Sequence, residues 1–554
     1  MKNIVAAILR ILTRREKLKL FGHVLLDLLI GLLDIVFLGV LLIIINFYTT
    51  GVYPEGFHFM QALFNQNSLL LAGVFFLLYA VKNWIGYLIT KAQNFFFYEV
   101  ASRLSKRNIR DYLNDDYFKF IHIDSSVYIR KISQQPIEFS NYILTNVQQV
   151  ISQVILIFFT VAAILFYHPG LFLSLFLLLL PPVVLLGYFI KIKLADVRTH
   201  SKLTSQLCLQ YLNESLSGYI ESNVYEKNDF FTERYFRRQR QLNDYIAVQQ
   251  TLQGLPSRLI EVFAILGFLV LIAINKWAAN SHGIGLLDIG VFMAASYKII
   301  PGIVKILNST GQIKTYEFTL NDLPTGETSM DKSPERGANG IHSIKFCKVD
   351  FKYRHHQLLE KLCLEIHPGD FVGISGSSGI GKTTIINLLL GFLEQDSGLI
   401  SINNADTSGF DRQQYWRRVS YVKQQPFFIN DSVLKNITLT EGPYDSVRLN
   451  EALAFCGLDA VIRRYPEGLN KIITENGKNI SGGQRQRLML ARALYPDFDL
   501  LVLDEPFSEM DETAEKTILT KLRLLAREGK MIIIITHNKA SLSFCNKTIL
   551  LDGA

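Results

Sequence analysis

The sequence predicts a membrane protein of two parts, in which an all-α region of six membrane-spanning helices precedes an α/β domain with a mainly parallel sheet. Two observations support this fold class. Of the 554 residues, 49% are hydrophobic and only 19% are charged, and the long apolar runs lie in the N-terminal part. The C-terminal part instead alternates helices with short apolar runs such as DFVGISG, LLVLDEP and MIIIITH, a pattern typical of parallel strands.

The six predicted spans are apolar runs long enough to cross a bilayer, since about 20 helical residues cover the roughly 30 Å of hydrocarbon. The loop TTGVYPEGFHFMQALFNQN has no Lys or Arg, whereas RLSKRNIRDYLNDDYFK on the opposite side is rich in both. The positive-inside rule therefore predicts a multi-pass protein of the cell's inner (cytoplasmic) membrane, with both termini and the C-terminal domain in the cytoplasm. The spans are expected near 20–48, 68–98, 141–167, 170–192, 255–276 and 286–310.

The segments between these spans indicate further organisation. Residues 101–135 and 198–249 are polar but helically periodic, which favours helical extensions into the cytoplasm over a disordered linker. Residues 320–340 are rich in Pro, Gly, Ser and charge, and mark a linker between a transmembrane domain (1–319) and a C-terminal domain (341–554). The net charge is +8, and the basic residues cluster beside the apolar runs, which favours loops at a membrane face over a nucleic-acid-binding surface. The five cysteines are scattered and are expected to be reduced.

The stretch GISGSSGIGKTT follows a predicted strand and opens a predicted helix, where glycines let backbone N–H groups approach phosphate oxygens. At this spacing Lys382 reaches the β- and γ-phosphates of a nucleotide, and the hydroxyl of Thr383 is a ligand for Mg²⁺. A plain glycine-rich turn is the alternative. The predicted ATP-binding residues here are Gly376, Ser377, Ser378, Gly379, Gly381, Lys382, Thr383 and Thr384.

The stretch DLLVLDEP supplies two carboxylates at the end of a predicted strand. Asp504 is placed to hold Mg²⁺ through water, and Glu505 is placed to polarise an attacking water. An acidic pair at a strand end is weak evidence alone, but it is strong evidence when it follows a phosphate loop.

The stretch ISGGQRQR presents a hydroxyl and bare backbone amides in front of another predicted helix, and so predicts a second anion site. One domain binds only one triphosphate. The second site is therefore expected to contact the γ-phosphate held by another copy of the chain, in a homodimer. Its residues are Ser481, Gly482, Gly483 and Gln484.

With these motifs in this order, residues 341–554 resemble the ATP-binding-cassette (ABC) transporter family, and the chain resembles its exporter-type half-transporters. The resemblance implies a P-loop NTPase cassette with a helical subdomain, and catalytic roles for Glu505, His537 and Gln424. Two departures are Ile480 in place of the usual leucine and FSEMD in place of a small-residue loop. By resemblance, Tyr353 stacks on adenine, Gln424 contacts Mg²⁺, Glu475 lies in a contact loop, Asp511 crosses the dimer interface and His537 contacts the γ-phosphate.

This resemblance leaves two classes of function open: ATP-driven transport, and a cassette that gates a channel or regulates a partner. A gate does not need an intact Glu505, so that residue favours transport. The family couples the cassette to the membrane through short helices at the tips of the extensions. We expect them near DDYFKFIHIDS and GYIESNVYEKN, the second docking on the other chain.

Charged residues at membrane depth bear on the substrate. They either snorkel or pair, as Asp34 could with Lys82, or they line a basic cavity that suits an anionic headgroup. Patches such as AASYKIIPGIVKIL are similar to bacterial lipid-linked-oligosaccharide flippases, which implies export or flipping of an amphipathic, lipid-linked substrate. A peptide, toxin or drug exporter is the alternative. The candidate cavity residues are Lys82, Arg258, Lys298 and Lys305.

Overall fold

The computed structural model describes residues 2–50, 69–115, 117, 121, 123–167, 169–277, 286–323, 340–353 and 356–551. The chain forms two compact units, of which the first comprises residues 1–115 and 122–328. The second comprises residues 116–121 and 329–554. Most of the linker predicted at 320–340 lies outside the described residues.

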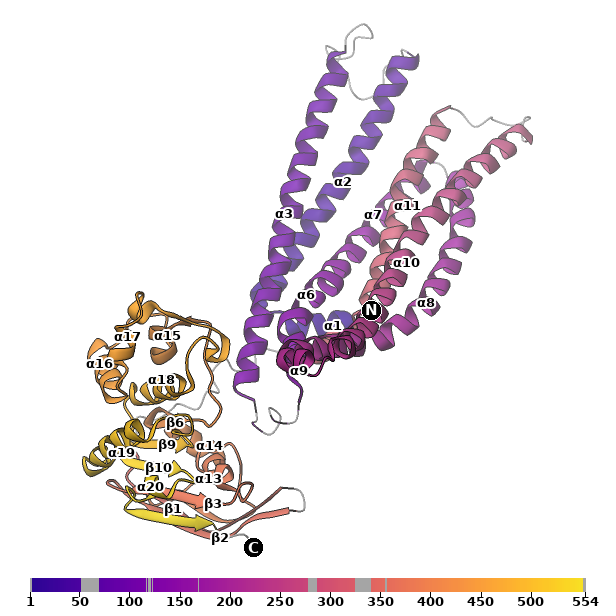
Figure 1. Ribbon diagram of the computed structural model, residues 1–554. Coiled ribbons are helices and arrows are strands. Elements are labelled where there is room, and N and C mark those ends of the chain that lie inside the picture. The colour runs from indigo at the N-terminus through magenta and orange to yellow at the C-terminus, as the bar shows by residue number, and fades with distance from the viewer. Residues whose placement is uncertain are drawn as a thin grey trace. The chain divides into compact units, whose positions relative to one another are not determined.

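The first unit is built of long helices (Figure 1), and four of the predicted spans lie within α2, α8, α10 and α11. The span predicted at 68–98 falls in α3 from Leu70 onward, and that predicted at 141–167 runs from η3 into α7. Helix α10 packs along α8, and α11 packs along α7. The helices of this unit are α1 (Lys2–Ile11), α2 (Arg14–Thr50), α3 (Leu70–Leu113), α5 (Ser125–Ile129), η2 (Arg130–Gln134), α6 (Gln135–Glu138), η3 (Phe139–Leu144), α7 (Thr145–Tyr167), α8 (Pro169–Ser217), α9 (Tyr219–Val224), α10 (Asn228–Trp277), α11 (Leu286–Thr315) and α12 (Phe318–Asp322).

Three helical segments of the described part are long and apolar enough to cross a membrane. They cover residues 14–45, 70–113 and 125–162, and so overlap the first three predicted spans. The other three predicted spans lie within α8, α10 and α11.

The polar stretches between spans are helical, as predicted. Helix α8 continues to Ser217 and α10 starts at Asn228, so the chain between spans four and five is helical almost throughout. Between these two helices lies α9, where the second coupling helix was expected. Its apolar side chains are largely exposed, with Tyr219 at 71%, Ile220 at 69% and Val224 at 69%.

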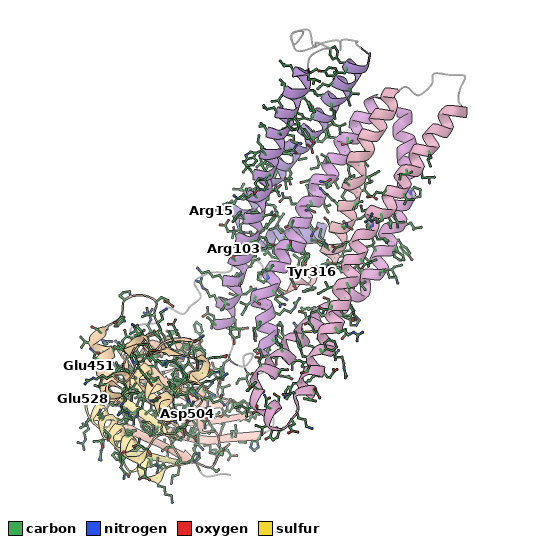
Figure 2. All side chains as sticks on the ribbon, turned by 45° about the horizontal axis from the view of Figure 1, so that its top comes forward. Arg15, Arg103, Tyr316, Glu451, Asp504 and Glu528 are labelled. Carbon is green, nitrogen blue, oxygen red and sulfur yellow. The ribbon has the colours of Figure 1, made fainter. Side chains whose placement is uncertain are left out.

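Buried charged and aromatic contacts hold the helices of the first unit together. The guanidinium of Arg130 is 2% exposed and donates to Glu138 at 2.9 Å. The rings of Tyr142 and Tyr316 stack at 3.9 Å, which joins η3 to the end of α11 (Figure 2). Arg103 on α3 forms an ion pair with Glu16 on α2 at 2.6 Å.

The second unit contains a five-stranded parallel sheet of order β11-β3-β10-β9-β6 and an antiparallel sheet of order β2-β1-β4-β5. Strands β9 and β10 are fully buried because a parallel sheet is covered on both faces. The strands are β1 (Ile344–Tyr353), β2 (His356–Ile366), β3 (Phe371–Gly376), β4 (Ser397–Ile402), β5 (Ala405–Asp406), β6 (Val419–Val422), β7 (Asp431–Ser432), β8 (Ile472–Ile473), β9 (Leu500–Asp504), β10 (Met531–Ile535) and β11 (Lys547–Leu551).

Helices accompany both sheets, and α15 and α16 pack on α18, with an apolar core that continues into the parallel sheet. The helices of this unit are α13 (Lys382–Leu389), α14 (Gly409–Gln413), η4 (Gln414–Arg418), α15 (Val433–Thr438), α16 (Ser446–Phe455), α17 (Asp459–Ile462), η5 (Gly468–Asn470), η6 (Glu475–Gly477), α18 (Gly482–Leu494), α19 (Glu512–Arg527) and α20 (Lys539–Leu542).

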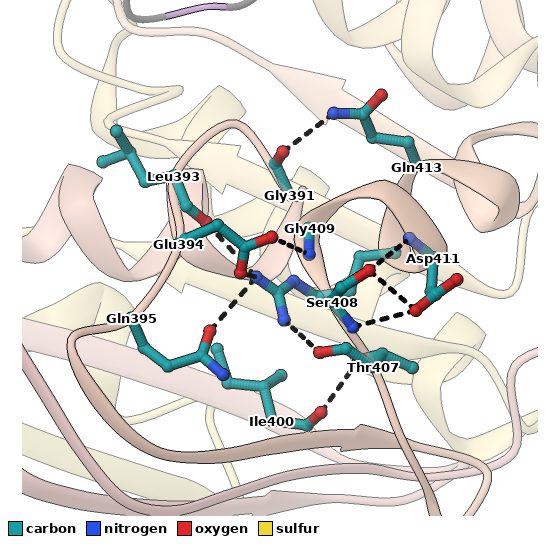
Figure 3. Close-up of polar contacts among 11 residues, drawn as sticks. Gly391, Leu393, Glu394, Gln395, Ile400, Thr407, Ser408, Gly409, Asp411 and Gln413 are labelled. Carbon is teal, nitrogen blue, oxygen red and sulfur yellow. Dashed lines mark hydrogen bonds and ion pairs between the residues drawn. The ribbon is translucent and has the colours of Figure 1, made fainter.

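A buried arginine organises the connection between the two sheets. Arg412 is 1% exposed and donates to the carbonyl oxygens of Thr407 at 2.7 Å and Leu393 at 3.2 Å. It also pairs with Glu394, whose carboxylate accepts the N–H of Gly409 (Figure 3). These contacts join the segment after α13 to the start of α14.

Candidate active site

The predicted phosphate loop lies between β3 and α13. Gly379 and Gly381 adopt φ of +82° and +103°, a region that glycine enters at little cost. A side chain at Gly376 would lie 2.7 Å from the carbonyl oxygen of Leu551, so the loop needs glycine there for space. The ammonium of Lys382 donates to the carbonyl oxygens of Gly376 and Ser377, both at 2.9 Å, which holds it over the loop.

The loop is joined to the end of β9. The hydroxyl of Thr383 donates to Oδ2 of Asp504 at 3.3 Å, which places two of the three predicted Mg²⁺ ligands side by side (Figure 2 marks Asp504). Burial raises the pKa of Asp504. This donor set fits Mg²⁺, which prefers oxygen ligands and usually takes one or two carboxylates together with substrate phosphates. Among the described residues there is no cluster of three or more His, Cys, Asp or Glu side chains that would hold a metal alone.

Glu505 follows Asp504 and has a strained backbone with φ +47°, while its N–H donates to the carbonyl of Ile535. Its carboxylate lies between two other predicted residues. Gln424 Nε2 donates to one oxygen at 2.8 Å, and His537 Nε2 lies 3.1 Å from the other. Three separate loops therefore converge on one carboxylate.

Tyr353 ends β1 and is half-buried. Its ring packs edge-on against Phe351 at 5.0 Å, and its hydroxyl is hydrogen-bonded to Thr384 on α13. Burial raises the pKa of this phenol. The predicted adenine platform is thus tied to the phosphate loop, a contact that sequence spacing does not reveal.

The second predicted anion site is the N-terminus of α18. Ser481 caps the helix: its Oγ accepts the N–H of Gln484 at 3.4 Å, and its own N–H donates to Oε1 of Gln484 at 3.0 Å. This reciprocal pair is a capping box. Ser481 is exposed at the helix end, where the N–H groups of the first turn lie.

Sequence reasoning missed the role of Glu509. A Cβ at Gly482 would overlap the carboxylate of Glu509 and come within 3.0 Å of its Cβ. Glu509 also pairs with Arg485 at 2.9 Å, and its N–H donates to Oε1 of Gln486 at 2.9 Å. The FSEMD departure noted in the sequence was the available signal, since the glutamate stands where a small residue is usual.

Two further residues were expected from the resemblance: Asp511 at the dimer interface and Glu475 in a contact loop. Asp511 caps α19 by accepting the N–H of Ala514 at 2.8 Å, and hydrogen bonds from Thr513 and Ala514 lower the pKa of Asp511. Its other oxygen lies 3.5 Å from Arg487 on α18. Glu475 is exposed and starts the short helix η6.

The candidate cavity residues differ in burial and in ion pairing. Lys82 is 6% exposed and forms an ion pair with Asp34 on α2, the pairing that the sequence left as an alternative. Arg258 and Lys305 are exposed, and neither makes an ion pair with the described residues. The side chain of Lys298 lies outside the described part.

The comparisons with known proteins agree with this arrangement. Residues 359–508 match the family model for ABC transporters. An ATP-dependent lipid A-core flippase of Burkholderia pseudomallei is 28% identical over 366 residues, which cover 64% of this chain and 60% of that protein. Another, from Alkalilimnicola ehrlichii, is 30% identical over 62% of this chain and 59% of that protein. The alignments thus span about 60% of the length of these relatives.

A solved structure of a bacterial Atm1-family ABC exporter with ATP bound has the same fold, with a TM-score of 0.77 over 97% of this chain and 94% of that one, at 19% identity. The family model covers the phosphate loop, the ISGGQRQR stretch and the Asp504–Glu505 pair. Residues 359–508 therefore match the ABC transporter domain, and the chain has the fold of that exporter structure, in which a helical N-terminal region precedes one α/β cassette.

Proposed function

We propose that this chain is an ATPase that, as a homodimer, exports or flips an amphipathic, anionic, lipid-linked substrate across the inner membrane. The observation that carries the proposal is the position of Glu505. Its carboxylate lies between Gln424 and His537, directly after the Asp504 that contacts Thr383 of the phosphate loop. A cassette without catalytic turnover has no need of this arrangement.

In the proposed reaction, the amides of the phosphate loop and Lys382 hold the triphosphate. Glu505 accepts a proton from the attacking water, and Gln424 and His537 orient that carboxylate. Mg²⁺, held by Thr383, Gln424 and Asp504, would neutralise charge on the phosphate oxygens.

The homodimer is inferred from two features. The capped N-terminus of α18 is an anion site at Ser481, but each chain has a single phosphate loop, so a second copy would bring a triphosphate to it. Helix α9 exposes the apolar side chains of Tyr219, Ile220 and Val224, a surface suited to docking on the cassette of the other copy.

The coupling helix expected near DDYFKFIHIDS is supported by contacts within the second unit. Residues 116–121 group with the cassette, and the ring of Tyr117 lies 4.7 Å from that of Phe392, which in turn lies 5.2 Å from Trp416. An aromatic cluster of this kind would pass movement of the cassette to the helices that flank residues 116–121.

The substrate class rests on charge at membrane depth and on the relatives. Arg258 and Lys305 are the described cations left for a basic cavity once Lys82 is paired with Asp34. Cations inside a membrane domain usually mark a substrate or ion path. Two relatives are named ATP-dependent lipid A-core flippases, which supports a lipid-linked substrate.

The test uses the full chain in lipid nanodiscs for ATP turnover, with lipid extracts added, and in proteoliposomes for transport of a lipid-linked oligosaccharide. We expect turnover that rises with the substrate. Lys305→Ala and Lys298→Ala should abolish transport and leave basal turnover intact, while the control Lys516→Ala, an exposed lysine on α19, should change neither.

Unchanged transport in both lysine variants would contradict the basic cavity. Stimulation by peptides or drugs rather than by lipids would favour the alternative exporter. Ion conductance without substrate-stimulated turnover would indicate a gated channel, and absence of ATP turnover would contradict the proposal altogether.

A further inference from the structure

Two cysteines face each other on the antiparallel sheet of the cassette. Strand β1 pairs with β2 so that Lys345 lies opposite Glu365 and Phe346 lies opposite Leu364. A bulge follows directly, because Val349 pairs with Leu362. Cys347 and Lys348 of β1 therefore share one position of β2, that of Cys363.

Both thiols lie on the same, exposed face of the sheet. Side chains alternate along a strand, and Phe346 and Leu364 are buried in the core at 1% and 7% exposure. The preceding pair on the outer face is Lys345 and Glu365, which form an ion pair at 3.9 Å. Cys347 and Cys363 follow two residues further along and are exposed, free thiols.

A direct contact places the sulfur of Cys363 beside the neighbouring backbone. The N–H of Lys348, the residue after Cys347, donates to Sγ of Cys363 at 3.3 Å. A disulfide needs Cβ atoms about 3.5–4.5 Å apart, next to the spacing of about 4.5–5.5 Å between neighbours across antiparallel strands. The bulge after Phe346 brings Cys347 to the position of Cys363 without a strict ladder pair on either residue.

The other cysteines lack such a neighbour. Cys208 and Cys456 are buried in different units, and burial raises the pKa of the Cys545 thiol to about 12. A thiol reacts as its thiolate, so exposure favours Cys347 and Cys363 for reaction with a solute.

We propose that Cys347 and Cys363 are a modification site that forms a reversible intramolecular disulfide with a low-molecular-weight disulfide as oxidant. One cysteine thiolate attacks the small disulfide and releases one small thiol, leaving a mixed disulfide. The second cysteine thiolate then attacks the protein sulfur and displaces the other small thiol. The two protein thiols lose two hydrogens and two electrons, and the small disulfide is reduced to two thiols.

The disulfide would link β1 to β2, the strands on either side of Tyr353, the predicted adenine platform. Strand β1 ends at Tyr353, which lies opposite His356 at the start of β2. A covalent link at Cys347 would fix the β1–β2 register on the approach to Tyr353. The chemistry at this site does not rest on the proposed transport function.

The experiment equilibrates the full-length protein in detergent with a series of oxidised-to-reduced glutathione ratios, quenches with acid, alkylates free thiols and maps peptides without reduction. We expect one linked peptide pair, containing Cys347 and Cys363, that appears as the ratio rises and is lost with dithiothreitol. Cys347→Ser and Cys363→Ser should each abolish that pair and leave glutathione on the remaining thiol, whereas Cys545→Ser should retain it.

Three results would overturn the proposal. The first is complete alkylation of both thiols of the wild type at the most oxidising ratio. The second is a persistent glutathione adduct on either cysteine of the wild type, and the third is a disulfide between two chains in place of the internal one. Because the readout is peptide mass, these results do not depend on whether the protein hydrolyses ATP or transports lipid.

Discussion

Glu505 and His537 form a close pair in the cassette, with Oε1 of the carboxylate 3.1 Å from Nε2 of the imidazole. The other carboxylate oxygen accepts a hydrogen bond from Gln424. Strand-end loops of β6, β9 and β10 therefore meet at one acidic group, and a parallel sheet explains why, since the carboxyl ends of its strands share an edge.

The first prediction concerns this carboxylate. Glu505→Gln keeps the shape and the contact with Gln424 but removes the proton acceptor, so ATP turnover should fall by at least about 100-fold, the usual contribution of a general base. Affinity for a fluorescent ATP analogue should stay within a few-fold of the wild type. The matched control is Glu528→Gln, an exposed glutamate at the end of α19.

The second prediction tests the close approach of Glu509 to Gly482, the first residue of α18. Gly482→Ala should impair folding or turnover, because its Cβ would overlap the Glu509 carboxylate, and overpacking costs about 1–3 kcal/mol. The double variant Gly482→Ala with Glu509→Ala should recover thermal stability. If the second substitution gives no recovery, Glu509 is not the obstacle. Gly483→Ala is not a suitable control because it lies in the same anion site.

The third prediction concerns the buried guanidinium of Arg412. Arg412→Ala would leave the carbonyl oxygens of Thr407 and Leu393 without their donor and Glu394 without its partner. The free energy of unfolding of the cassette should fall by about 3 kcal/mol, because two buried carbonyl oxygens lose their donor, whereas Glu394 is largely exposed and contributes little. Denaturant unfolding followed by tryptophan fluorescence measures this loss. Arg417→Ala, an exposed neighbour, should cost less than about 0.5 kcal/mol.

The fourth prediction separates a structural lysine from those proposed for the cavity. Lys82→Ala leaves Asp34 without its cation between apolar helices, so it should lower thermal stability in detergent by on the order of 3 kcal/mol. Replacing both residues by leucine should restore most of that stability. Lys305→Ala should instead leave stability unchanged and affect transport. Equal stability of the wild type and Lys82→Ala would contradict the structural role.

Much of the cassette could be predicted from the sequence because its chemistry depends on local patterns. The glycines of the phosphate loop, Lys382 and the Asp504–Glu505 pair lie within short stretches whose backbone geometry follows from residue type. The strands DFVGISG, LLVLDEP and MIIIITH appear as β3, β9 and β10, as expected. The location of α9 was also predicted, because a polar, periodic stretch must turn back on itself there.

Features that depend on packing between distant segments could not be predicted. The pairing of Lys82 with Asp34 requires the relative rotation of α2 and α3, which hydropathy does not encode. The contact of Glu509 with Gly482, and that of Tyr353 with Thr384, joins segments whose spacing in the chain gives no sign of proximity. The approach of Cys347 to Cys363 likewise follows only from the bulge between β1 and β2.

The most direct measurement is a structure of the Glu505→Gln variant in lipid nanodiscs with saturating Mg²⁺ and ATP. The proposed mechanism predicts two copies of the chain with a nucleotide between them, its phosphates held by Lys382 of one copy and its γ-phosphate within hydrogen-bonding reach of Ser481 of the other. Nucleotide bound at Lys382 while Ser481 of each copy stays remote from any phosphate would contradict it.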